Sequence, residues 1–133
     1  MLRPIEEVPG YVDILYNLLA ERTPEQSISH REMPTKEQHT VFVDGEPYFC
    51  WYMIIIASQP VGSVYLTDQR EIGIAIFKKH RGQGYAKQAV KDIIALHPGD
   101  FLANINPDNF ASRMFFTENF RTERIQETYR CSL

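Results

Sequence analysis

Cysteine is scarce in this sequence, and basic residues are not clustered. The two cysteines, Cys50 and Cys131, form no CxxC pair and no other metal-ligand spacing. We therefore expect buried free thiols, with no disulfide and no bound metal. The formal net charge is -3, and no long run of Lys and Arg occurs. Binding to nucleic acid is disfavoured, because affinity for phosphate backbones needs clustered basic side chains.

Long hydrophobic segments are absent as well. The longest apolar run covers residues 48–57, which is about half the length of a membrane span. The first residues, MLRPIEEVPG, lack the basic start and the apolar core of a signal peptide. These features predict a cytoplasmic protein without a membrane partner.

No linker, repeat or low-complexity segment divides the chain. With 133 residues and 44% apolar composition, we expect a single α+β domain over residues 1–133. Apolar spacing, turn residues and β-branched content predict its elements. In chain order they are a strand at 1–5, a helix within 8–22, a helix that follows Thr35, an antiparallel meander of strands at 47–57, 61–66 and 71–77, a helix at 85–96, a strand at 101–105, a helix at about 109–118, and a final strand or hairpin arm at 121–133.

Two glycines lie where the helix at 85–96 should begin. Gly82 and Gly84 follow the strand at 71–77 and directly precede the helix. A strand, a turn and a helix N-terminus in succession direct several backbone N–H groups at one point, where the helix dipole favours negative charge. Glycine lets the backbone approach an anion without a Cβ in the way. We name residues 81–86 the glycine turn and predict that it binds a phosphate or pyrophosphate group.

The glycine turn also resembles a known signature. Its spacing fits neither a Walker A motif nor the GxGxxG of a Rossmann unit. The sequence RGQGYA at residues 81–86 instead matches Gln/Arg-x-x-Gly-x-Gly/Ala, the signature of the GNAT superfamily of acetyl-coenzyme A-dependent N-acetyltransferases. The expected order of elements is similar to the whole GNAT fold. The segment NPDNFASRMFFTENF is similar to the family's asparagine-bearing turn and the helix that follows it.

This resemblance implies a fold, a co-substrate and a reaction. The fold is α+β with three layers, α/β/α, around a central, mixed, mostly antiparallel sheet whose fourth and fifth strands splay apart. The co-substrate is acetyl-CoA (with CoA as product), and the partner is a small-molecule amine that receives the acetyl group by direct transfer. No metal is implied.

The resemblance also implies cofactor-binding residues. Backbone groups of Ile74, Ala75 and Ile76 hydrogen-bond the pantetheine arm, and Asn109 meets the same region. The pyrophosphate binds the backbone amides of Arg81, Gly82, Gln83, Gly84, Tyr85 and Ala86. The apolar side chains at 74–76 are also suited to a core, and Asn109 is suited to a helix N-cap.

Acetyl transfer to an amine needs a group that accepts the ammonium proton. Glu71, at the start of the signature strand, lies roughly where several GNAT members carry a carboxylate base; an exposed charge at a strand end is an equal alternative. His30, in the loop before Thr35, is a second candidate with a suitable intrinsic pKa. Glu32 and His39 are weaker candidates.

The expected general acid is missing from the pattern. Many GNAT members carry a tyrosine in the helix after the asparagine, which protonates the departing coenzyme A thiolate. Phe115 occupies that position here, and phenylalanine donates no proton. A hydroxyl from elsewhere, a water or no acid at all must then serve.

The acceptor and the activity have alternatives. An amino-sugar nucleotide, another small amine, and a peptide or protein N-terminus all suit the acceptor. Tyr48, Trp51, Tyr52 and Tyr65 either line a sugar or nucleotide site or belong to the core. Phe115 also allows a module that binds coenzyme A without transferring an acetyl group, and the glycine turn alone allows an ordinary structural turn. Exposed strand edges of such a sheet allow a homodimer.

Overall fold

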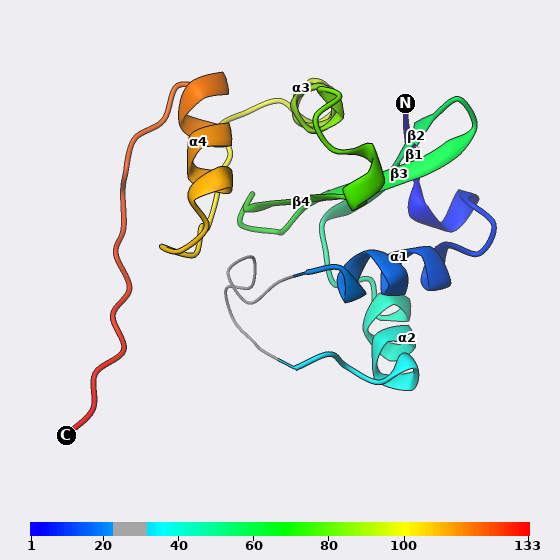
Figure 1. The fold of residues 1–133 in the computed structure, drawn as a ribbon, viewed down its shortest axis with the longest axis horizontal. Helices are drawn as coiled ribbons and strands as arrows, with labels where there is room; N and C mark the ends of the chain where they lie inside the picture. The colour runs from blue at the N-terminus through cyan, green and yellow to red at the C-terminus, as the bar shows by residue number, and fades with distance from the viewer. Residues whose placement is uncertain (23–31) are drawn as a thin grey trace.

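The chain folds around a four-stranded sheet with helices on both faces (Figure 1). The computed structural model describes residues 1–22 and 32–133. The strands are β1 (Leu2–Pro4), β2 (Cys50–Ile56), β3 (Gln59–Leu66) and β4 (Ile72–Ile76). The helices are α1 (Tyr11–Ala20), α2 (Lys36–Asp44), α3 (Tyr85–Leu96) and α4 (Phe110–Asn119), with two short 3-10 helices, η1 (Ile5–Glu7) and η3 (Lys78–His80).

The four strands pair antiparallel in the order β1-β2-β3-β4. The predicted meander is therefore confirmed, and β1 extends it, with Leu2 opposite Ile54. Across the sheet, Trp51 of β2 lies opposite Tyr65 of β3, which lies opposite Gly73 of β4. Residues that lie opposite one another share a face, so these three form one row.

Two hydrophobic cores lie on opposite faces of the sheet. Met53 packs with Leu15 of α1 and Val43 of α2. Its neighbour Ile54 packs with Val90 of α3 and Phe116 of α4. Successive strand side chains point to opposite faces, so we name these the α1/α2 face and the α3/α4 face. The predicted three-layer α/β/α class is confirmed.

The local sequence explains where the helices begin. At α2, the N–H of Gln38 donates to Thr35 Oγ1 (3.1 Å) and the N–H of Thr35 donates to Gln38 Oε1 (2.9 Å), which is a capping box. Helix α3 covers the predicted range and begins after Gly84, which has a left-handed backbone. Asn109 caps α4, since its Oδ1 accepts a hydrogen bond from the N–H of Ser112 (3.0 Å).

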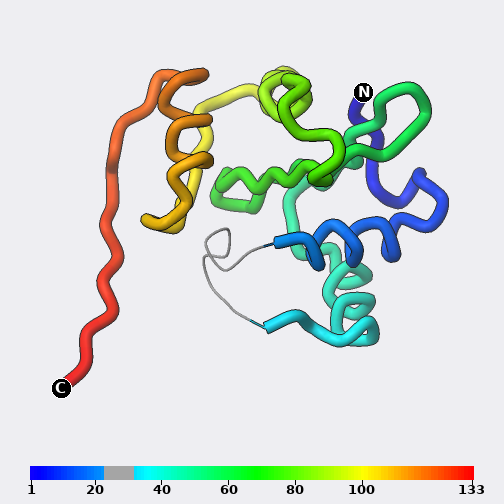
Figure 2. Tube along the Cα trace, viewed as in Figure 1, coloured from blue at the N-terminus to red at the C-terminus, as the bar shows by residue number. Residues whose placement is uncertain are grey.

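Two strands predicted near the C-terminus are not formed. Residues 101–105 make a single isolated parallel bridge between Leu102 and Glu71, so the parallel part of the predicted mixed sheet is this bridge alone. Residues 121–133 are exposed extended chain (Figure 2) and pair with no strand among the described residues. Their apolar and polar residues alternate as in a strand, but a strand needs a neighbour for its backbone hydrogen bonds. The prediction of a final strand was wrong for this reason.

Candidate active site

The glycine turn lies between the end of β4 and the start of α3. Gly82 (φ 78°) and Gly84 (φ 82°) are both left-handed, a conformation that costs other residues roughly 1–2 kcal/mol. A Cβ at either position would meet no atom within 4 Å. The backbone conformation therefore favours glycine here, and the backbone is open to a ligand.

The glycine turn presents backbone donors without partners. In the part of the chain that the structure describes, the N–H groups of Gly82, Gln83 and Gly84 donate no hydrogen bond. The first N–H groups of a helix such as α3 also lack intrahelical partners. Lys78 and Lys79 are exposed in η3 and add positive charge beside the turn. This combination suits an anion such as a phosphate or pyrophosphate group.

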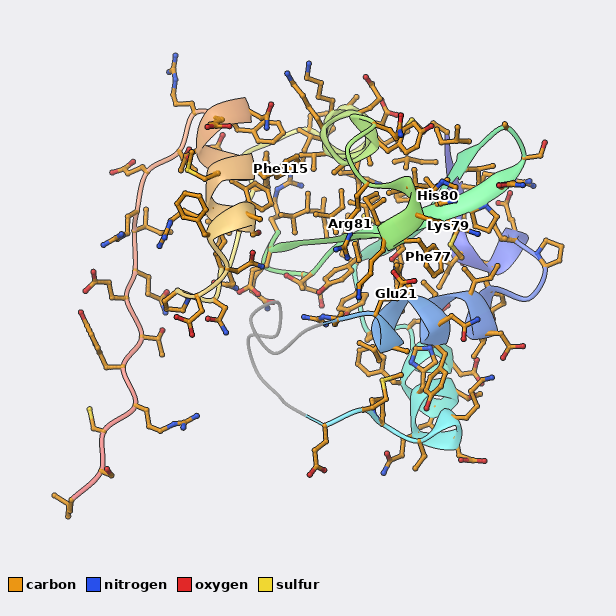
Figure 3. All side chains as sticks on the ribbon, viewed as in Figure 1. Glu21, Phe77, Lys79, His80, Arg81 and Phe115 are labelled. Atoms are coloured by element: carbon orange, nitrogen blue, oxygen red, sulfur yellow. The ribbon has the colours of Figure 1, made fainter. Side chains whose placement is uncertain are left out.

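Two side chains support the segment that leads into the turn. The Nε of Arg81 donates to the carbonyl oxygen of Ile76 at the end of β4 (3.0 Å). Glu21, which follows α1, accepts a hydrogen bond at its Oε1 from the N–H of Lys78 (2.8 Å). Figure 3 shows Glu21 directed toward η3. The end of α1 thus holds η3 in place, and the Arg81 guanidinium is directed back to β4.

Among the residues that the structure describes, no strand pairs with the outer edge of β4 next to the turn, so this edge is open. The N–H of Phe77 donates to the carbonyl oxygen of Val61 in β3, and the N–H of Thr67, directly after β3, donates to the carbonyl oxygen of Glu71 (2.9 Å each). Because such bonds alternate along an antiparallel pair, the odd-numbered residues of β4 bond to β3 and the even-numbered residues point outward. The backbone groups of Ile74 and the N–H of Ile76 therefore face the open edge. Those of Ala75 face β3, so the predicted backbone contact of Ala75 with a ligand at the open edge does not fit this geometry.

Glu71 lies at the start of the open edge. It is half-buried, and its N–H donates to Thr67 Oγ1 (3.0 Å). By strand alternation its side chain shares the α1/α2 face with Gly73. Glu71 also forms the bridge to Leu102, so it marks the point beyond which residues 101–105 leave β4.

The other predicted bases are not grouped with Glu71. His30 lies outside the described residues. Glu32 is exposed. His39 is buried, with only 5% of its surface exposed, and its ring contacts the edge of the Tyr16 ring. Burial lowers the pKa of His39, and its Nε2 has no hydrogen-bond partner among the described residues. His39 is therefore enclosed between α1 and α2.

Asn109 and Phe115 belong to the segment that follows residues 101–105. The Oδ1 of Asn109 is used as the α4 cap. Phe115 is half-buried and contacts the rings of Phe116 (centroids 5.0 Å apart) and Phe120 (5.9 Å). Figure 3 shows Phe115 on α4. The surroundings of Phe115 are aromatic, in keeping with the absence of a hydroxyl at this position.

Tyr48, Trp51 and Tyr65 form an aromatic cluster on the α1/α2 face. The sequence indicates these residues individually but does not predict their contacts. The Tyr48 and Tyr65 rings stack with centroids 3.6 Å apart and planes inclined by 3°. Trp51 meets the edges of both. Burial raises the pKa of Tyr48, and the adjacent Tyr65 adds to this effect. The sequence signal for the cluster was Gly73, a glycine inside a strand, which often marks a close approach by another group.

A family model described as "Acetyltransferase (GNAT) domain" matches residues 1–119. The match covers most of the chain, including the glycine turn, the open edge of β4 and α4. The chain belongs to the GNAT acetyltransferase family. The resemblance seen in the sequence is confirmed. This is a family of acyltransferases that generally use acetyl-CoA as co-substrate.

Solved N-acetyltransferases have a similar fold. A variant of the spermidine N-acetyltransferase SpeG from Vibrio cholerae is 17% identical and gives a TM-score of 0.68 over 89% of this chain and 76% of that one. An N-acetyltransferase from Staphylococcus aureus Mu50 is 17% identical, with a TM-score of 0.65 over 89% of this chain and 80% of that one. A chimera of Vibrio cholerae SpeG and hSSAT is 18% identical, with a TM-score of 0.55 over 71% of this chain and 61% of that one. The GNAT chain thus spans about three fifths of the chimera. No curated protein matches the chain.

Several further expectations for this GNAT chain concern metals, membranes and thiols. In residues 1–22 and 32–133, no group of three or more His, Cys, Asp or Glu side chains could hold a metal ion. No helix in the same ranges is long and apolar enough to cross a membrane. Cys50 and Cys131 are both free thiols, as predicted. Cys50 is half-buried, but Cys131 is exposed, so the prediction of a buried thiol was wrong for Cys131.

Proposed function

We propose that this chain, as one domain over residues 1–133, is an N-acetyltransferase that moves the acetyl group of acetyl-CoA to a primary amine by direct transfer. The observation that carries the proposal is the junction of two features: unpartnered N–H donors at 82–84 and the open outer edge of β4, which leads directly into them. The first suits a pyrophosphate, and the second suits an extended amide-containing arm. Acetyl-CoA contains both groups and supplies the acetyl thioester.

In this proposal the glycine turn binds the pyrophosphate through the backbone amides of residues 81–86, and Lys78 and Lys79 offset part of its charge. The outward backbone groups of Ile74 and Ile76 bind the arm. Asn109 holds α4 through its Oδ1 and offers its amide NH₂ to the same region. Ala75 contributes its side chain to the α1/α2 face.

The direction of the arm follows from the position of the turn. The pyrophosphate lies at the α3 end of β4, so the arm runs back toward the start of the strand. Five strand residues span about 16 Å, and this path brings the thioester close to Gly73 and Glu71. The two residues share the α1/α2 face, from which the amine then approaches.

Glu71 is the base in this proposal. An alkylammonium is charged at neutral pH, so a base must take its proton directly or through a water. Glu71 is half-buried at the place where residues 101–105 leave β4, which is where the amine and the thioester meet. His30 is the second candidate for this role. Neither cysteine forms an acetyl-enzyme, because burial raises the pKa of the Cys50 thiol and Cys131 lies in the exposed C-terminal segment.

The acceptor is a small molecule with a primary amine. Two structurally similar proteins are named as spermidine N-acetyltransferases, which supports a small amine as the substrate class. An amino-sugar nucleotide is a second acceptor of this class, and a peptide N-terminus is the alternative acceptor class. Phe115, with its aromatic surroundings, favours one further candidate, a module that binds coenzyme A without transfer.

The test is thiol release from acetyl-CoA in the presence of a set of amines, with acetylated products identified by mass spectrometry. The set contains spermidine, a simple alkylamine, an amino-sugar nucleotide and a short peptide with a free N-terminus. We expect one class to accelerate thiol release, and Glu71→Gln to reduce it by about 100-fold or more. Glu37→Gln, which changes an exposed carboxylate of α2, is the matched control. Binding of acetyl-CoA without acceleration by any amine would support the binding module instead.

A further inference from the structure

Tyr65 of β3 extends sideways over the neighbouring strand. A Cβ on Gly73 would overlap with the Cζ, the Cε2 and the hydroxyl oxygen of Tyr65. The phenol therefore lies directly against the Gly73 backbone. Gly73 does not have a positive φ, so the backbone conformation does not require glycine at this position. The phenol of Tyr65 does require it, because any other residue would displace the ring.

The aromatic cluster holds the Tyr65 ring in this position. Tyr48 stacks on it with 3.6 Å between centroids. Trp51 meets the Tyr48 ring at 4.7 Å and the Tyr65 ring at 6.0 Å between centroids, in edge contacts. Because Trp51, Tyr65 and Gly73 form one cross-strand row, the contacts come from rigid strands. The hydroxyl is thus pre-organised by packing, as a catalytic group needs to be.

The hydroxyl is held on the same face as the proposed base. Gly73 lies two residues after Glu71 on β4, so their side-chain positions point to one face. Tyr65 lies opposite Gly73, which makes Tyr65 and Glu71 diagonal neighbours across the strand pair, a separation within reach of long side chains. A phenol and a carboxylate are thus directed to the stretch of β4 where the proposed function places the thioester.

Phe115 has no hydroxyl, so the side chain at this position cannot donate a proton to the leaving sulfur. Phe115 packs with the core on the α3/α4 face, whereas Tyr65 lies on the α1/α2 face. The α3/α4 face therefore has no hydroxyl at position 115, and the α1/α2 face holds the hydroxyl of Tyr65 in a fixed position. These are two separate observations, and both favour Tyr65 as the proton donor for the leaving group.

We propose that the Tyr65 hydroxyl is the general acid of the acetyl transfer; this inference rests on the proposed function. The amine nitrogen forms a bond to the acetyl carbon as the bond from that carbon to sulfur breaks. Tyr65 donates its hydroxyl proton to the departing sulfur. Glu71, which has already passed the ammonium proton to water, accepts the second proton that the amine nitrogen loses. Proton exchange through water then returns Tyr65 to the phenol and Glu71 to the carboxylate. The products are the acetylated amine and the free thiol.

The first test is Tyr65→Phe, which keeps the ring and removes the hydroxyl. We expect kcat to fall by about 10- to 100-fold, at or below the lower end of the usual range for general acids because a thiolate is already a fair leaving group. The affinity for acetyl-CoA should stay within about 3-fold, since the pyrophosphate and the backbone contacts remain. Tyr52→Phe is the matched control. Its hydroxyl bonds to His97 Nε2 (2.8 Å), on the α3/α4 face, so we expect kcat to be unchanged.

A binding measurement tests the same contact without catalysis. Coenzyme A and desulfo-coenzyme A, which lacks the sulfur, are titrated calorimetrically into the parent protein and into Tyr65→Phe. A hydrogen bond from Tyr65 to the sulfur should give the parent protein a preference of roughly 2- to 10-fold for coenzyme A. Tyr65→Phe should lose this preference, and Tyr52→Phe should keep it. A structural role of Tyr65 in the aromatic cluster would not change this ratio.

The variant Gly73→Ala gives an independent test with the hydroxyl still present. Its Cβ displaces the Tyr65 phenol, so we expect the same loss of kcat and the same loss of preference for the sulfur. Unchanged kcat and an unchanged ratio of affinities in Tyr65→Phe would overturn the proposal. Thiol release that no amine accelerates in the parent protein would overturn the proposed function and this inference with it, and that result is distinct because it does not depend on Tyr65.

Discussion

The replacement of Gly84 by alanine separates the conformational cost of the glycine turn from its role in binding. Gly84 precedes α3 with φ 82° and ψ 7°, and Gly10 precedes α1 with φ 72° and ψ 20°. A Cβ at either glycine would meet no atom within 4 Å. Both glycines are therefore N-caps with similar backbone angles and open surroundings, but only Gly84 lies beside the proposed pyrophosphate. Gly10→Ala is the control for Gly84→Ala.

The two variants should lose the same stability and differ in affinity. A left-handed alanine costs about 1–2 kcal/mol at each site, so we expect equal decreases in the free energy of unfolding, measured by urea denaturation. At Gly84 the methyl group also adds bulk within the turn that carries the unpartnered N–H groups. The loss of one charge-assisted hydrogen bond there corresponds to about 1.5–3 kcal/mol, or a roughly 10- to 150-fold increase in the Kd for acetyl-CoA. Gly10→Ala should leave this Kd unchanged.

Gly84→Asp extends the comparison. Relative to Gly84→Ala, it should lose less stability but more affinity for acetyl-CoA. Aspartate adopts the left-handed conformation more readily than alanine, so the fold should be destabilised less. Its negative charge at the turn should weaken the binding of acetyl-CoA more strongly than the methyl group does. Equal Kd values for the parent protein, Gly84→Ala and Gly84→Asp would refute the placement of the pyrophosphate.

Three further predictions concern the support of the turn, a buried histidine and the cysteines. Glu21→Ala should weaken acetyl-CoA binding more than Glu21→Gln, because only a side-chain oxygen can accept the hydrogen bond from the N–H of Lys78; calorimetry on both variants checks this. Burial lowers the pKa of His39 from 6.5, so its contribution to stability is complete above about pH 6.5 and declines as the pH falls from there toward the lowered pKa, by at most about 1.4 kcal/mol per pH unit. Urea denaturation from about pH 8 to about pH 5 should show this decline, and His39→Phe should lack it. The double variant with Cys50→Ala and Cys131→Ser should keep its turnover in the thiol-release assay; a loss of turnover would indicate an acetyl-enzyme.

Much of the fold follows from local signals in the sequence. The capping pair Thr35 and Gln38, and the glycine before Tyr85, place the starts of α2 and α3 where the structure has them. The meander is read from short turns between β-branched segments. These signals act within a few residues, so a sequence alone contains them. Pairing at the C-terminus is different, because residues 101–105 and 121–133 have strand composition but form strands only if a neighbour is present.

The part of the candidate site that is formed by a local motif was predictable, because such a motif acts within a few residues. The glycine turn is a contiguous motif, so the sequence alone contains it, and the structure gives both of its glycines a left-handed backbone. The position of Tyr65 against Gly73 depends on the register of two strands, which no motif encodes. His39 was a weaker candidate for the base by residue type, and the packing of α1 on α2 encloses it. Tertiary packing thus decides which side chains reach the substrate.

The central claim is that the glycine turn and the open edge of β4 together bind acetyl-CoA. The most direct measurement is calorimetric titration of the protein with acetyl-CoA and, in parallel, with a pantetheine fragment that lacks the pyrophosphate and the adenine. We expect micromolar binding of acetyl-CoA and a large loss of affinity for the fragment, because the N–H donors at 82–84 then have no anion to bind. The absence of detectable binding of acetyl-CoA, or equal affinity for the fragment, would contradict this placement of acetyl-CoA.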